Sequence, residues 1–176
     1  MNYATIKWHD VSNGPGVRVS LYVSGCRNKC KNCFNPETWD FSYGQPFDET
    51  VQDKILETLV PAYMNGLTVL GGEPMEPENQ ADLLPFLRRY KQRFPDKPLW
   101  LFTGYTLEEL QPDGIRCTEH TEGILELLDI LVDGRFVEEL KDLKLRFRGS
   151  SNQRLIDMNK TRASGEVTIW EGVEHL

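Results

Sequence analysis

Two hydrophobic periods alternate along this chain, one typical of strands and one typical of helices. Residues 17–23 alternate and are rich in β-branched side chains, which predicts a strand. Residues 78–94 place leucines three or four positions apart on one face, which predicts a helix. The same patterns predict strands over residues 66–70, 98–102, 130–132, 145–148 and 167–170, and helices over 49–65, 106–110, 122–128 and 136–143. Residues 1–16 read as a polar lead with a turn. Strands that alternate with helices indicate βαβ units and a largely parallel sheet.

The length of the chain limits how many such units it can hold. A complete eight-unit (βα) barrel typically takes about 250 residues, and this chain has 176. We therefore expect an α/β fold in which residues 1–176 form a single domain, an incomplete (βα) barrel of about five or six units that is open at one side.

Marked residues directly follow five of the predicted strands. They are Cys26, Gly71, Thr103, Asp133 and Ser150. In parallel α/β proteins, the carboxyl ends of the strands share one edge, and loops converge there to form sites. One shared site at this edge explains five marked segments better than five separate structural needs do.

Composition narrows the class of protein and its compartment. The net charge of −7 argues against a general nucleic-acid or membrane-surface binder, and the hydrophobic share of 39% is that of a globular protein. No apolar stretch approaches the 18 or so residues that span a bilayer, and the N-terminus lacks a signal-peptide core. We expect a cytoplasmic protein, in which clustered cysteines bind metal or act in catalysis rather than form disulfides.

The most informative pattern is the CxxxCxxC spacing of Cys26, Cys30 and Cys33, which follows the first strand and Gly25. Extended, this segment would reach roughly 23 Å, so it must curl if all three thiolates hold one inorganic centre. Three thiolates on a 4Fe–4S cube would leave one iron open for another ligand. Structural zinc with a histidine, a disulfide and unliganded thiols stay open as alternatives, although Cys117 is solitary and no histidine has ligand spacing. The histidines are His9, His120 and His175.

Positive charge gathers near the cysteines despite the acidic total. Arg18, Arg27, Lys29 and Lys31 were expected to surround the cysteine loop. One interpretation is that these side chains only keep the loop solvated. The other is that they offset the charge of the thiolates and offer a docking face to an acidic electron carrier such as flavodoxin.

Longer stretches around these motifs resemble the radical S-adenosylmethionine enzymes. The cysteine motif with its flanks, residues 13–39, looks like the branch that activates anaerobic ribonucleoside-triphosphate reductase. The likeness continues through residues 70–74, 100–105, 129–136 and 147–154, and so covers nearly the whole chain. In one departure, Asn32 stands before the third cysteine where many radical S-adenosylmethionine enzymes carry an aromatic residue, and the aromatic residue here is Phe34.

The resemblance implies a function and two cofactors. A 4Fe–4S cluster on the three cysteines would bind S-adenosylmethionine and cleave it reductively to a 5′-deoxyadenosyl radical. That radical would generate a glycyl radical on the catalytic subunit of the reductase, the protein partner. Alternatives are an activator of another glycyl-radical enzyme, a small-molecule radical S-adenosylmethionine enzyme and, from a different class, a zinc-binding module without catalysis.

The resemblance also implies roles for rim residues. Gly71, Gly72 and Glu73 would border the amino group of S-adenosylmethionine, and Thr103 and Gly104 would approach the same ligand. Tight turns at strand ends are the structural alternative for these residues.

Four further polar residues are candidates for the site, two after the strand predicted at residues 130–132 and two in the polar run that begins at Ser150. The resemblance implies that Asp133 meets the ribose hydroxyls and that Arg135 pairs with the methionine carboxylate, whose geometry suits its planar fork. Asn152 and Arg154, in a polar run after Ser150, are further candidates for binding the ligand, and a hydrophilic turn is the alternative.

Overall fold

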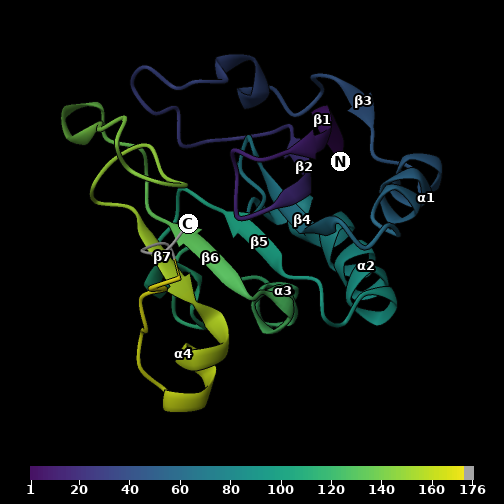
Figure 1. Cartoon of the computed structure of the whole chain (residues 1–176). Coiled ribbons are helices and arrows are strands. Elements are labelled where there is room, and N and C mark those ends of the chain that lie inside the picture. Colours follow the sequence, from purple (N-terminus) through teal and green to yellow (C-terminus); the bar gives the residue numbers. More distant parts are fainter. Residues whose placement is uncertain (173–176) are drawn as a thin grey trace.

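The computed structural model describes residues 1–172, so His175 lies outside it. The fold is α/β, with one seven-stranded sheet in the order β3-β1-β2-β4-β5-β6-β7 (Figure 1). The strands are β1 (Asn2–Asp10), β2 (Val17–Val23), β3 (Gln45–Pro46), β4 (Met64–Gly71), β5 (Leu99–Phe102), β6 (Ile130–Asp133) and β7 (Arg154–Asp157). The helices are α1 (Glu49–Thr58), α2 (Pro77–Arg93), α3 (Thr121–Leu127) and α4 (Met158–Ser164), and the 3₁₀ turns are η1 (Pro36–Trp39), η2 (Glu108–Leu110) and η3 (Glu138–Leu140).

The sheet is mixed rather than largely parallel. Strands β2, β4, β5 and β6 run parallel to one another and form its centre. Strand β1 pairs antiparallel with β2, the short β3 pairs antiparallel with β1, and β7 pairs antiparallel with β6. The α/β class is therefore confirmed, and the parallel core aligns the carboxyl ends of four strands at one edge.

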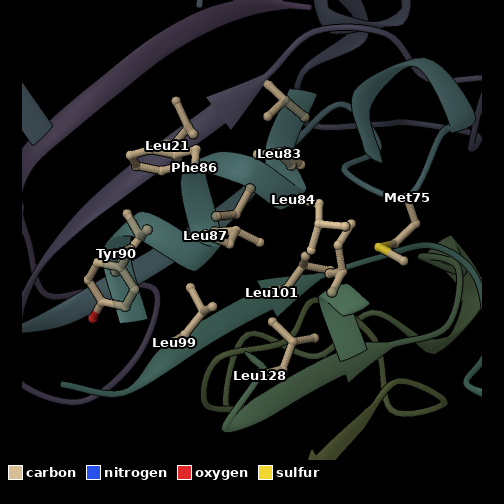
Figure 2. Packing of buried hydrophobic residues seen from close by; sticks show 14 of the residues in the cluster. Leu21, Met75, Leu83, Leu84, Phe86, Leu87, Tyr90, Leu99, Leu101 and Leu128 are labelled. Carbon is tan, nitrogen blue, oxygen red and sulfur yellow. The ribbon is translucent and has the colours of Figure 1, made fainter. Parts of the chain in front are cut away.

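Alternating residues of the central strands enter two separate hydrophobic clusters, as the period of two requires. Leu21, Leu67 and Leu101 belong to the larger cluster, which also contains side chains of α1, α2 and α3. Figure 2 shows side chains of α2, including Leu84 and Leu87, pointing toward those of β5. The other face of the sheet carries a smaller cluster, formed by Trp100, Ile130, Val132 and Leu155. Helices α1, α2 and α3 thus cover one face, and the opposite face is left to loops.

Helix α1 begins as the sequence predicts but ends earlier. Asp48 caps it, accepting a hydrogen bond from the Val51 amide at 3.1 Å. The prediction that this helix extends through residue 65 is wrong, because it ends at Thr58 and β4 begins at Met64. Pro61 cannot continue a helix without losing a backbone hydrogen bond, and it lies in the turn between the two elements instead.

The predicted strand at residues 145–148 is also wrong, because these residues form an irregular loop. The last main strand is β7, where the sequence was ambiguous, and the predicted segment 167–170 makes only a single bridge, between Ile169 and Ile156. Strand β1 is an element that the sequence interpretation missed. The segments 106–110 and 136–143, predicted as helical, contain only single 3₁₀ turns.

This arrangement places the predicted site residues at the carboxyl ends of the central strands. Cys26 follows β2, Gly71 ends β4, Thr103 follows β5 and Asp133 ends β6. Ser150 does not follow a strand. Within residues 1–172, the structure contains no helix that is both long and apolar enough to cross a membrane.

Candidate cluster and cofactor site

A cavity of about 660 Å³ opens at the carboxyl edge of the central strands. Eight of the residues that the sequence singled out line it: Cys26, Cys30, Cys33, Gly71, Gly72, Glu73, Thr103 and Gly104. The other four, Asp133, Arg135, Asn152 and Arg154, lie beside the cavity but are not part of its lining. Segments far apart in sequence therefore form one site, as the strand-end pattern predicts.

The cysteine loop curls because several residues adopt left-handed backbone conformations. Gly25 has φ of 95°, and Lys29 and Asn32 have φ of 46° and 56°. A side chain at Gly25 would collide with the ring of Phe41, which packs directly against this position. Most residues avoid left-handed backbone conformations, whereas glycine and asparagine adopt them more readily. The sequence between the cysteines thus favours the tight loop that a shared inorganic centre requires.

The amide of Asn35 donates a hydrogen bond to the Cys33 sulfur at 3.4 Å. Backbone amides also act on the other two thiols: those of Asn28 and Lys29 oppose the rise in the pKa of Cys26, and that of Phe136 opposes the rise in the pKa of Cys30. Such bonds favour the ionised form of a thiol. They also tune iron–sulfur clusters that thiolates bind.

Burial opposes ionisation of two of these thiols. It raises the pKa of Cys26 to about 11, and burial together with the neighbouring Cys33 raises the pKa of Cys30. A thiolate in such a setting is stabilised by a cationic metal centre. The four cysteines of the chain are all free of disulfide bonds, which removes the disulfide alternative for this structure.

The described residues hold no ready-made site for a single metal ion. Among residues 1–172, no three His, Cys, Asp or Glu side chains converge as ligands of one metal ion would. The thiolates of a 4Fe–4S cube each bind a different iron, so they need not converge on one point. Three cysteines around an open cavity fit such a cluster, with one iron left for a further ligand.

Glu73 links the cysteine loop to two strand ends from a fully buried position. Its carboxylate accepts hydrogen bonds from the Thr103 hydroxyl and the Gly104 amide, each at 2.7 Å, and from the Met75 amide at 2.9 Å. The side-chain amide of Asn28 donates to it at 2.9 Å. Burial raises the pKa of Glu73 to about 7, although these donors oppose the shift. Glu73 therefore acts here as a structural acceptor that orders the floor of the cavity.

Glu76 holds the residue that follows the first cysteine. Its fully buried carboxylate accepts hydrogen bonds from the Arg27 amide at 2.8 Å and from the Arg27 guanidinium at 2.7 Å. The Tyr105 hydroxyl donates to the same carboxylate at 3.2 Å. The exposed Glu78 pairs with the other side of the guanidinium. The start of α2 thereby fixes the backbone of the cysteine loop.

The glycines at the rim are required by close chain packing. A Cβ at Gly72 would lie 2.8 Å from the Gly25 carbonyl oxygen, and one at Gly104 would lie 2.3 Å from the side-chain nitrogen of Asn28. Gly71 has φ of 109°. These observations support the tight-turn interpretation, and the approach of a ligand to Gly71, Gly72 and Gly104 stays a prediction.

Asp133 is buried and already has partners. Arg154 donates to it through Nε at 2.9 Å, and the Leu107 amide donates to its other oxygen at 2.8 Å. Arg154 also pairs with Glu108. Arg135 is half-exposed and donates to the Asn28 side-chain oxygen at 3.2 Å. The ligand contacts proposed for these side chains stay predictions, and what the structure shows is that Arg154 ties β7 to the rim.

The prediction that Arg18 belongs to the positive charge around the cysteine loop is wrong. Arg18 does not lie near the cysteines, because it is buried at the opposite end of β2, where it donates to Thr68 and to the Leu67 and Pro98 carbonyls. Arg27 is paired with Glu76 and Glu78, and Lys31 lies 3.5 Å from Glu139. Lys29 is exposed. The positive charge around the loop is therefore smaller than the sequence indicates.

Comparisons with known proteins agree with this site. A family model described as a 4Fe–4S single cluster domain matches residues 12–156. The anaerobic ribonucleoside-triphosphate reductase-activating protein of Pasteurella multocida is 44% identical over 155 residues, which cover 87% of this chain and 95% of that protein. The chain belongs to this family of activating proteins. The family members of Escherichia coli K12 and phage T4 are 39% and 38% identical, over 87% and 88% of this chain and 96% and 93% of their own lengths. The resemblance and the 4Fe–4S prediction are confirmed.

The sequence interpretation missed three residues that shape the site of this family member. They are Asn28, Glu76 and Gln153. Asn28, within the cysteine loop, donates to Glu73, Glu76 accepts from the Arg27 amide of that loop, and Gln153 lines the cavity. A signal existed for Glu76, because Pro77 marks the start of a helix and a carboxylate is favoured at that end.

Proposed function

We propose that this protein activates anaerobic ribonucleoside-triphosphate reductase by generating a glycyl radical on its catalytic subunit. The observation that carries this proposal is the cavity in which the three cysteines meet the glycine-rich rim. Membership of the activating family names the protein substrate. Together they indicate an enzyme of the radical S-adenosylmethionine class.

The residues of this chain hold and orient the cofactors. Cys26, Cys30 and Cys33 would bind the 4Fe–4S cluster. The chemistry that this group supplies when bound is reductive cleavage of S-adenosylmethionine to methionine and a 5′-deoxyadenosyl radical, which takes a hydrogen atom from a glycine of the reductase. The backbone at Gly71 and Gly72 would border the amino group of the ligand.

The remaining candidates would bind other parts of the same ligand. Thr103 and Gly104 would lie along it, Asp133 would meet the ribose, and Arg135 would pair with the carboxylate. Asp133 would do so while held in position by Arg154, whose Nε donates to its carboxylate at 2.9 Å. Asn152 and Arg154 would support this end of the site.

The finer fold and setting follow from the same proposal. Residues 1–176 would form one radical S-adenosylmethionine domain, an incomplete (βα) barrel whose open side admits a polypeptide. The protein would work in the cytoplasm without binding nucleic acid or membranes. An acidic electron carrier such as flavodoxin would dock at Lys29 and Lys31, and reversing both charges would slow reduction by the carrier more than reduction by dithionite.

The test is an anaerobic assay with purified protein reconstituted with iron and sulfide. Electron paramagnetic resonance should show a glycyl radical on the reductase, together with 5′-deoxyadenosine formation. Replacing Cys30 by Ala removes one cluster ligand and should abolish both signals. A radical on another glycyl-radical enzyme but not on the reductase would reassign the substrate, and colourless protein with stoichiometric zinc would refute the cluster.

A further inference from the structure

One irregular loop, residues 136–149, forms a wall of the cavity. We call it the wall loop. Its residues Leu143, Leu145, Phe147 and Arg148 line the same cavity as the three cysteines. In Figure 1 it is the green segment that leaves the end of β6 and returns to β7. Because it lines the cavity and reaches the surface, anything large that enters would touch it.

Contacts with the cysteine loop fix one end of the wall loop. The rings of Phe136 and Phe34 lie 5.3 Å apart between centroids. Glu139 lies 3.5 Å from Lys31, and the Nζ of Lys141 lies over the Phe34 ring, 5.3 Å from its centroid. The position of the wall loop is therefore set relative to the cysteines.

A polar clasp closes the other end. The side-chain oxygen of Gln153 accepts hydrogen bonds from the Gly149 amide at 2.8 Å and the Ser150 amide at 3.1 Å, and its nitrogen donates to the Gly134 carbonyl at 2.9 Å. The hydroxyl of Ser150, fully buried, accepts from the Val137 amide at 3.2 Å. One glutamine thus joins the beginning and the end of the loop, which gives the polar run after residue 149 a positioning task.

The rim of this wall is apolar and exposed. The side chains of Leu143, Phe34 and Leu140 are 88%, 64% and 43% exposed. Leu143 nevertheless borders the cavity. Exposed apolar side chains gathered around an opening are typical of surfaces that bind other proteins. S-adenosylmethionine bound among the strand ends would leave these rim side chains uncovered.

We propose that the wall loop recognises the polypeptide segment of the reductase that carries the reacting glycine, with Leu143 as a contact and Gln153 as the positioning residue. This inference rests on the proposed function. The segment must enter the cavity to reach the cofactors, and the wall loop lines the cavity from the rim inward. An electron carrier needs only to approach the cluster, so it makes no demand on the cavity lining.

Leu143→Asp tests the contact, with Val60→Asp as the matched control. Val60 is 50% exposed and lies before β4, at the end of the sheet away from the cavity. The Kd of the cluster-loaded protein for the reductase is measured directly. We expect Leu143→Asp to weaken binding about tenfold or more, because burying a leucine contributes at least that factor. Val60→Asp should leave the Kd unchanged.

Gln153→Ala tests the positioning task. It should increase hydrogen exchange in residues 136–149 and weaken reductase binding by a larger factor than it weakens the affinity for S-adenosylmethionine. An unchanged Kd in Leu143→Asp, or an equal loss of affinity for S-adenosylmethionine, would overturn the inference. If wild-type protein binds the reductase through the wall loop but installs no radical, the proposed function fails, and only the docking of the reductase at the wall loop is supported.

Discussion

Replacing Glu76 by Ala should destabilise the protein by about 3 kcal/mol. The fully buried carboxylate satisfies the Arg27 amide and the Tyr105 hydroxyl, and neither donor makes another hydrogen bond within residues 1–172. Leaving a buried donor unsatisfied costs about 1–3 kcal/mol each. The guanidinium of Arg27 adds little, since it is 46% exposed and keeps Glu78. For a chain of this length, the loss corresponds to a fall in Tm of about 10 °C.

Anaerobic thermal unfolding of cluster-free protein, followed by circular dichroism, measures this loss. Glu78→Ala is the control, because it removes the exposed partner of the same arginine and should cost less than about 1 kcal/mol. Iron content after reconstitution gives a second measurement, and Glu76→Ala should retain less cluster than Glu78→Ala. Equal losses in the two variants would refute the role of burial in this reasoning.

Two further predictions concern the floor of the cavity. Burial raises the pKa of Glu73 to about 7, so the folded state binds a proton more tightly than the unfolded one, and stability due to this group is lost as the pH rises from about 4.5 to 7. Urea unfolding at a series of pH values measures this loss. Between pH 4.5 and 7, the free energy of unfolding of Glu73→Gln should rise by about 3 kcal/mol relative to that of wild type, and an equal pH dependence in the two proteins would contradict the role of burial. Gly104→Ala places a methyl group 2.3 Å from Asn28, so iron content after reconstitution should fall although circular dichroism stays that of a folded protein. Full iron content would show that Asn28 moves without consequence.

The position of the site was predictable because strand ends in a parallel core share an edge. The pattern of residues 17–23 fixed β2, and the segments around Gly71 and Thr103 fixed the neighbouring ends. The cysteine spacing then gave the three candidate cluster ligands. These features depend on local sequence and on the period of the strands, so no knowledge of long-range contacts was needed.

The contacts that hold the cysteine loop were not predictable in the same way. Glu76 meets Arg27 across 49 positions of sequence, and Arg154 meets Asp133 across 21. Arg18 appeared to belong to the cysteine loop by proximity in sequence, but β2 carries it to the opposite end of the sheet. Pairings between distant segments depend on how the chain folds back, which periodicity alone does not reveal.

Strand β1 was missed because its apolar side chains are only partly buried. Tyr3, Ile6 and Trp8 pack against the core from near the edge of the sheet, between charged and polar neighbours. The segment at residues 145–148 showed the opposite problem. Its alternating apolar residues Leu145 and Phe147 line the cavity, and Phe147 packs on the face of the sheet at Trp100 without joining the sheet as a strand. Alternation alone therefore did not separate a strand from a loop that packs on the sheet.

The antiparallel return of β7 has a consequence for how this scaffold can diversify. Antiparallel neighbours can be joined by a two-residue turn, yet residues 134–153 connect β6 to β7. Doubling such a connection costs only about 0.6 kcal/mol, and none of its backbone belongs to the sheet. Insertions, deletions or grafts between residues 138 and 148 would leave the central strands and the candidate cofactor residues in place, so relatives could exchange this one stretch to acquire new protein substrates while keeping the same iron chemistry.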